Sequence, residues 1–193
     1  MYNSRNSKKG FCLFIDENLE DKFVSVLSVL FPAALQQMIY RVRERHSLYD
    51  EIKWSKISSK KANFYCDVLD VFFSYSAARI SITPIYHNKE RAILHALKRV
   101  QPHCEIISAI FIDWYTVPSG YSFEDQISRI YHCDCVMRLD SKSNDLLQLV
   151  DLLMNIQIKS QCLESVLSHH KKKVLQTYLN YSVNSRQAKV FVV

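Results

Sequence analysis

Glycine and proline are scarce in this sequence, with 2 glycines and 4 prolines in 193 residues. So few glycines argue against a Gly-rich phosphate-binding loop, and so few of both argue against long flexible linkers. No run of about 20 apolar residues occurs, so we expect no transmembrane helix. The first residues, MYNSRNSKKG, are polar and basic and lack the apolar stretch of a secretory signal. We therefore expect a single cytoplasmic domain over residues 1–193, in which residues 1–9 form a loose basic leader.

The composition is that of a globular protein, with 48% hydrophobic and 23% charged residues. We expect the six cysteines to be reduced thiols, because no secretory signal precedes them. The net charge is +6 and the isoelectric point is near 9.0. This charge favours an anionic partner, and nucleic acid is the commonest such partner of an intracellular domain. We expect no membrane partner.

The segment from Asn144 to Lys159 is the longest apolar stretch that has the length of a core helix. Its polar residues recur at spacings of four, three, four and four, which places them in one strip along a helix. They are Asn144, Gln148, Asp151, Asn155 and Lys159. The strip alone is typical of an ordinary amphipathic helix with a solvated face. The alternative is that it faces a polar site inside the fold.

Two segments have the pattern of strands that are buried on both faces, and each ends in an acid. Residues 11–16 end in Asp16 and Glu17, and residues 105–115 run into Asp113. Ligands gather at the carboxyl ends of parallel strands. If these two strands are parallel neighbours, Asp16 and Asp113 project into the same crevice.

The remaining pattern predicts an α/β or α+β layered domain, with a mixed sheet flanked by helices. Residues 23–31 form an antiparallel hairpin with residues 11–16, and residues 50–57 read as a short extended segment. The further strands are expected at 79–86, 133–139 and 190–193, and the further helices at 32–45, 60–75, 89–100, 122–131 and 163–181. We expect residues 163–193 to form a C-terminal helical extension that is available for a homo-oligomer or a partner protein.

Acidic residues from distant parts of the chain are the candidates for catalysis: Asp16, Glu51, Asp113 and Asp151. Clustered carboxylates repel each other unless a cation neutralises them, and their oxygens suit Mg²⁺ or Mn²⁺. Two such ions can activate a water and stabilise the leaving oxygen of a phosphodiester. Nearby lysines at Lys53, Lys56 and Lys60 are the candidates for holding the substrate phosphates.

These motifs resemble an uncharacterised bacterial family, domain of unknown function 3800, over roughly residues 11 to 160. Asp16-Glu17 is similar to the family's Asp-Glu motif. The segment EIKWSKI, residues Glu51–Ile57, is similar to its Glu-x-Lys-Trp segment, and residues Gln148–Asp151 are similar to its Gln-x-x-Asp motif. The resemblance implies an RNase H-type fold and a metal-dependent nuclease. On this hypothesis we expect Asp16, Glu17, Glu51 and Asp151 to be ligands of one or two ions, and Gln148, Asn144 and Asn155 to orient those ligands.

The alternative is a catalytically inactive module of the same fold that binds nucleic acid or serves in assembly. The family tends to follow Asp-Glu with Ser-Gly, whereas this chain has Asn18-Leu19. It also favours small residues around the final Asp, where Val150 and Asn155 stand here. The nuclease would cleave nucleic-acid strands, whereas the inactive module would show only salt-dependent binding. An activity assay would therefore separate the two hypotheses.

Overall fold

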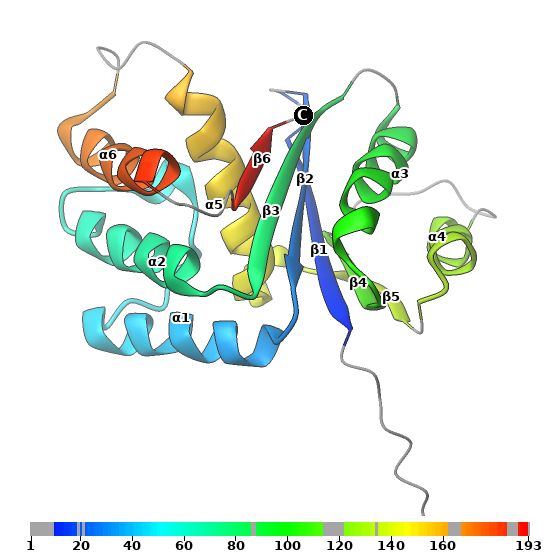
Figure 1. Cartoon of the computed structure of the whole chain (residues 1–193). Helices are drawn as coiled ribbons and strands as arrows, with labels where there is room; N and C mark the ends of the chain where they lie inside the picture. Colours follow the sequence, from blue (N-terminus) through cyan, green and yellow to red (C-terminus); the bar gives the residue numbers. More distant parts are fainter. Residues whose placement is uncertain are drawn as a thin grey trace, which may run out of the picture.

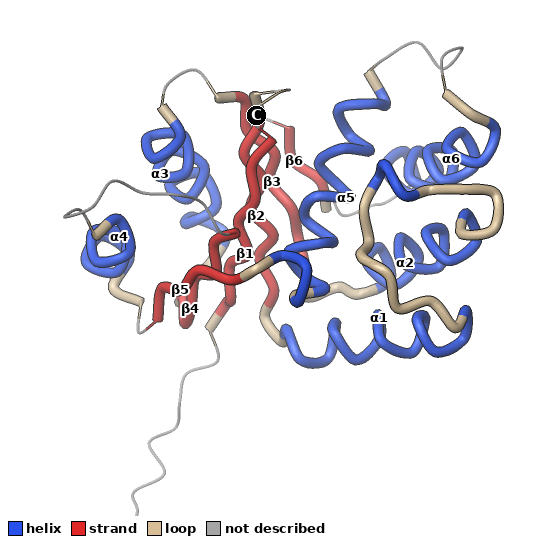
Figure 2. Tube along the Cα trace, turned by 180° about the vertical axis from the view of Figure 1, so that it is seen from behind, coloured by secondary structure: helices blue, strands red, loops and turns tan. Residues whose placement is uncertain are grey.

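The computed structural model describes residues 10–18, 20, 22–85, 88–113, 122–133, 135–161, 167–184 and 189–192, without the side chains of 182–184. The expected basic leader at residues 1–9 lies outside these residues, as do residues 163–166 of the expected C-terminal extension. The described part of the chain forms a mixed sheet between two layers of helices, as Figures 1 and 2 show.

The sheet has six strands in the order β5-β4-β1-β2-β3-β6. Their bounds are β1 Phe11–Asn18, β2 Phe23–Val29, β3 Ala78–Pro84, β4 Ile107–Asp113, β5 Cys135–Leu139 and β6 Val190–Val192. β1, β2 and β3 are antiparallel to one another in turn, whereas β4 pairs parallel to β1, β5 parallel to β4, and β6 parallel to β3. The predicted fold class, an antiparallel hairpin plus parallel strands flanked by helices, is confirmed.

The helices divide between the two faces of the sheet (Figure 1). One layer holds α3 (Lys89–Val100) and α4 (Phe123–Tyr131). The other layer holds α1 (Pro32–His46), α2 (Ala62–Ser74), α5 (Asp145–Ser160) and α6 (His169–Asn184). Short 3₁₀ turns lie at η1 (Trp54–Lys56), η2 (Gln101–His103) and η3 (Ser141–Ser143). The segment expected to be extended at 50–57 therefore contains the η1 turn.

The apolar run of β1 is continuous because both of its faces are buried. Leu13 and Ile15 belong to the core under α3 and α4, whereas Phe14 belongs to the core under α5 and α2. Successive side chains of a strand point to opposite faces, so a strand between two helical layers must be apolar at every position. The sheet thereby separates two hydrophobic cores.

Side chains at the N-cap positions of α3, α4 and α5 accept hydrogen bonds from backbone N–H groups of the first turn. The Ser122 hydroxyl accepts from the Asp125 N–H at the start of α4. Asn144 accepts from the N–H groups of Leu146 and Leu147, so it is the N-cap of α5. These bonds satisfy backbone donors that have no partner within the helix. We expected the Asn144 side chain to orient a metal ligand, but in the structure it caps α5.

The C-terminal segment is part of the same core. The Tyr181 ring of α6 stacks on Phe73 of α2 at 4.8 Å, and the Thr177 hydroxyl donates to the Cys66 sulfur at 3.3 Å. Tyr178 is 1% exposed, and β6 extends the sheet beside β3. The helix begins at His169, later than the predicted Leu163. Residues 169–184 therefore pack in the helical layer beside α2, and residues 190–192 form part of the sheet.

Among the residues that the structure describes, no helix has the length and apolar character needed to cross a membrane.

Candidate active site

The parallel pairing of β1 with β4 places two acids side by side. Phe14 lies opposite Phe111, and the two rings stack at 5.0 Å on the face that α5 covers. Two residues further along each strand the side chain returns to the same face. Asp16 and Asp113 occupy these positions, at the carboxyl ends of the strands. The conditional prediction that the two acids share a crevice is confirmed.

The polar strip of α5 brings the third acid to the same face. Asp151 lies where α5 crosses the end of β1. The Asn155 side-chain amide donates to Asp151 Oδ1 at 2.8 Å, one helical turn away. Asn155 Oδ1 in turn accepts from Asn18 Nδ2 of β1 at 3.4 Å. Asn155 therefore orients the Asp151 carboxylate and ties it to the first strand.

Gln148 connects α5 to the segment that carries Glu51. Its Oε1 accepts from the Ile52 N–H at 2.7 Å and from Arg43 Nη2 at 3.1 Å. Its Nε2 donates to the carbonyls of Ser141 and Lys142 at 2.9 and 3.0 Å. An amide side chain has two donors and two acceptor sites, and all four are filled here. Gln148 thus acts as a buried clamp rather than as the group that we expected to orient a ligand or water.

Because Gln148 holds the Ile52 N–H, the neighbouring residues Glu51 and Lys53 lie beside Asp16 and Asp151, at a shared cleft. Glu51 and Lys53 both line it, with Glu51 half-buried and Lys53 exposed. Glu51 Oε2 accepts from Lys56 Nζ at 2.8 Å. This bond lowers the pKa of Glu51, so the group is ionised at neutral pH.

The resulting cleft has a volume of about 140 Å³ and lies where β1, β4, α5 and the segment before η1 meet. Its lining contains all four acids expected to act in catalysis, together with Glu17. The lining residues are Asp16, Glu17, Glu51, Ile52, Lys53, Asp113, Ser141, Gln148 and Asp151. Acids separated by up to 135 positions along the chain therefore share one small space.

Negative charge in the cleft is only partly neutralised. Asp16 is 6% exposed, and burial raises its pKa well above the ordinary value, with further increases from the charges of Asp151 and Asp113. Burial also raises the pKa of Asp151, to about 6, although Lys53 opposes the shift. A carboxylate that is both buried and close to others is costly to ionise. A bound cation would remove that cost.

Glu17 and Asp113 both make polar contacts with the protein. Glu17 follows Asp16 directly and so leaves β1 on the other face, where its Oε1 pairs with Lys89 of α3. Within the described ranges, Glu17 Oε2 is buried without a hydrogen-bond partner. Asp113 Oδ1 accepts from the Ser141 N–H at 3.0 Å. Glu17 consequently borders the cleft from the α3 side, and Asp113 also holds the η3 turn.

The candidate phosphate-binding lysines differ in position. Lys53 lines the cleft, and Lys56 is adjacent through its bond to Glu51. Lys60 is exposed and is not among the lining residues. Near them, Trp54 is buried, with Lys171 Nζ 5.3 Å from the centre of its ring. Lys53 and Lys56 are therefore the two lysines best placed to contact a substrate.

The cleft offers oxygen ligands but no completed cage. In the described part of the chain, no group of three or more His, Cys, Asp or Glu side chains is close enough to hold one metal ion. The donors available are carboxylate oxygens, which Mg²⁺ and Mn²⁺ prefer. The residues fit such an ion in chemistry and charge, and an ion would have to draw the carboxylates together.

Arg43 is a site component that the sequence analysis did not select. It is 5% exposed, and its Nη2 pairs with Asp145 Oδ1 at 2.6 Å while also donating to Gln148. Its Nη1 donates to the Asp50 carbonyl at 2.6 Å. Arg43 thereby holds the segment before η1 against α5. In the sequence, Arg41, Arg43 and Arg45 stand at alternate positions of α1. Only its place on the buried side of the helix distinguishes Arg43 from the other two arginines.

Comparison with known proteins gives no match, whether to a family model, to a curated protein or to a solved structure. The resemblance to domain of unknown function 3800 therefore stays a prediction.

Proposed function

We propose that the protein is a cytoplasmic, divalent-metal-dependent nuclease that hydrolyses phosphodiester bonds of DNA or RNA at the acidic cleft. The observation that carries this proposal is the convergence of Asp16, Asp113 and Asp151, with Glu51 beside them, in one cleft of about 140 Å³. Carboxylates at the ends of parallel strands, faced by a further carboxylate on a packed helix, are a common arrangement for holding hard cations.

Asp16 and Asp151 are the proposed principal ligands of Mg²⁺ or Mn²⁺, with Glu51 completing the set. All three belong to different segments of the chain, and burial, together with the charges of neighbouring acids, raises the pKa values of Asp16 and Asp151. One or two bound ions would supply an activated water and stabilise the leaving oxygen. Asn155 keeps Asp151 in position for this role through its 2.8 Å hydrogen bond.

Substrate binding is assigned to the lysines at the edge of the cleft. Lys53 is exposed and lines the cleft, and Lys56 lies beside Glu51. Ammonium groups at such an edge contact backbone phosphates without reading the bases. The proposal therefore expects weak sequence preference.

A second candidate function, a nucleic-acid-binding module without catalysis, is favoured by one observation. Across the described ranges no three acids stand close enough together for one ion. If they do not close on a metal, the net charge of +6 would still favour binding of a polyanion.

The test is an assay of purified protein with Mg²⁺ and Mn²⁺ on single-stranded, duplex and RNA–DNA hybrid substrates. Asp16→Asn and Asp151→Asn should each reduce cleavage by about 10³-fold, because each removes a charged metal ligand while keeping the side-chain shape. Asp125→Asn, at an exposed position of α4, is the matched control and should retain full activity.

Full activity in both cleft variants, together with cleavage that survives a chelator, would overturn the proposed mechanism. Salt-dependent binding with no scission under either metal would instead select the binding module.

A further inference from the structure

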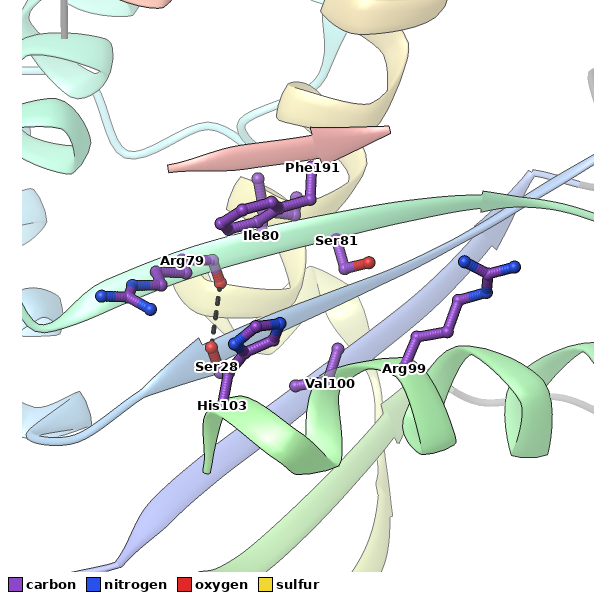
Figure 3. A pocket seen from close by; sticks show the side chains of 8 residues that line it. All are labelled: Ser28, Arg79, Ile80, Ser81, Arg99, Val100, His103 and Phe191. Carbon is purple, nitrogen blue, oxygen red and sulfur yellow. Dashed lines mark hydrogen bonds between the residues drawn. The ribbon is translucent and has the colours of Figure 1, made fainter. Parts of the chain in front are cut away.

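A second pocket, of about 180 Å³, lies on the α3 side of the sheet, away from the acidic cleft. It opens beyond the end of α3, where β2, β3 and β6 are not covered by that helix (Figure 3). Its lining residues are Ser28, Arg79, Ile80, Ser81, Arg99, Val100, His103 and Phe191. None of these residues lines the acidic cleft.

The polar lining of this pocket is basic. Arg79 comes from β3, Arg99 from the last turn of α3 and His103 from η2, and the described residues of the lining include no Asp or Glu. Among the ion pairs of the described residues, neither arginine has an acidic partner. The two guanidinium groups stand at opposite ends of the pocket in Figure 3, with His103 and Ser81 between them. Both side chains are exposed, so each guanidinium group has room to turn toward an anion that lies between them.

The charge of Arg79 already acts on a neighbouring group. Lys189 is 7% exposed, and its Nζ donates to the carbonyls of Phe72 and Tyr75. Burial lowers the pKa of Lys189 to about 8, and the charge of Arg79 lowers it further in the same direction. Arg79 and Lys189 together therefore make this edge of β3 positively charged.

The rest of the lining suits an organic group attached to the anion. The His103 and Phe191 rings lie nearly parallel, at 11°, with their centres 5.8 Å apart. Val100 adds buried apolar surface, and the Ser81 side chain supplies a hydroxyl. A flat or apolar group can pack on this surface while its charge meets the arginines.

We propose that this pocket binds a small phosphate-bearing ligand through Arg79 and Arg99. A guanidinium presents paired N–H donors that match the oxygens of a phosphate, which makes arginine the usual side chain for this contact. The ligand is either free phosphate or the phosphate of a nucleotide, whose base would pack against Phe191 and His103. This site does not depend on the nuclease proposal, because it shares no residue with the acidic cleft.

The experiment is a calorimetric titration of the full chain with inorganic phosphate, adenosine 5′-monophosphate and adenosine. The variants are Arg79→Gln and Arg99→Gln, and Lys98→Gln is the control, because it removes one exposed positive charge from the same helix without touching the pocket. Each arginine variant should bind the phosphate ligands about tenfold more weakly, and the control should bind them as the parent does.

Tighter binding of the nucleotide than of inorganic phosphate identifies a nucleotide site, and equal binding identifies a site for phosphate alone. Arg99 is exposed on a helix, so Arg99→Gln keeps the test decisive even if Arg79→Gln fails to fold. The proposal is overturned if neither phosphate ligand binds, if adenosine binds as tightly as its phosphate, or if Lys98→Gln weakens binding as much as Arg99→Gln.

Discussion

The acidic cleft and the basic pocket lie on opposite faces of one sheet and carry charge of opposite sign. The cleft gathers Asp16, Asp113 and Asp151 around the carboxyl ends of two parallel strands, under α5. The pocket gathers Arg79 and Arg99 where α3 ends and the sheet face is left open. The acids are buried or half-buried, whereas the two arginines are exposed.

This difference in burial decides what each charge costs the fold. Exposed guanidinium groups keep their hydration, so the basic pocket costs little stability. The buried carboxylates lose hydration and repel one another, and the pKa values of Asp16 and Asp151 rise for that reason. The cleft is therefore the region in which stability should respond to pH, to cations and to the residues that hold the acids in place.

The largest expected change in stability comes from removing the clamp of the cleft. Gln148→Leu leaves the Ile52 N–H and the Ser141 and Lys142 carbonyls without their partner. We expect a loss of about 3 kcal/mol in the free energy of unfolding, measured with denaturant, because buried polar groups would stay unpaired. Gln176→Leu, at an exposed position, should change it by less than about 0.5 kcal/mol. Equal losses in the two variants would show that the hydrogen bonds of Gln148 do not stabilise the fold more than those of an exposed glutamine.

The second-largest effect is expected when the free energy of unfolding is measured as a function of pH, because the acidic cleft should respond to pH and the basic pocket should not. The folded-state pKa of Asp151, about 6, lies above that of the unfolded chain, so the folded state binds more protons between about pH 4 and pH 6. Stability should therefore fall as pH rises through this window, by about 2 kcal/mol after allowance for partial exposure. Asp151→Asn should flatten this part of the curve. A curve that is as steep in Asp151→Asn as in the parent would contradict the assignment.

Divalent cations should reverse that loss. At pH 7.5, Mn²⁺ at ten times its dissociation constant would add about 1.4 kcal/mol to the free energy of unfolding, read as a rise in the melting temperature. At pH 5 the effect should be much smaller, because protons compete for Asp16 and Asp151, and it should disappear in Asp16→Asn. A rise of the same size in that variant would place the ion elsewhere.

The smallest effect is expected at the exposed edge of the cleft. Lys56→Gln removes the 2.8 Å pair with Glu51, yet stability should change by no more than about 0.5 kcal/mol because the ammonium group is largely solvated. If Lys56 contacts a phosphate, the salt dependence of nucleic-acid binding should lose about one unit of slope, measured by titration at several salt concentrations. Lys98→Gln, on the far face, is the control for simple loss of charge.

Several parts of the site follow from local pattern. The two apolar strands that end in Asp16 and Asp113 could be found because a buried strand stays apolar until it leaves the core. The strip of α5 could be found from its helical spacing, and it does face a polar site, with Asp151 and Gln148 lining the cleft. The alternation of a strand also accounts for Glu17, which must leave β1 on the face opposite to Asp16 and there meets Lys89.

Other features depend on partners that local pattern does not reveal. Gln148 was expected to act on a ligand, but its four hydrogen bonds go to groups at positions 43, 52, 141 and 142. Arg43 was not selected, because nothing in its neighbourhood along the chain marks it as the partner of Asp145. The basic pocket was not foreseen either, since its residues come from β2, β3, α3, η2 and β6.

Periodicity and the ends of apolar runs are local properties of the chain, so the succession of strands and helices, the two acids at strand ends and the polar strip of α5 can be predicted from the residues in order. The pairing of β1 with β4, the position of Asp151 over these strands and the gathering of basic side chains beyond α3 come from packing instead. Burial and charge neutralisation depend on groups far apart in the chain, and no local pattern specifies the distances between them.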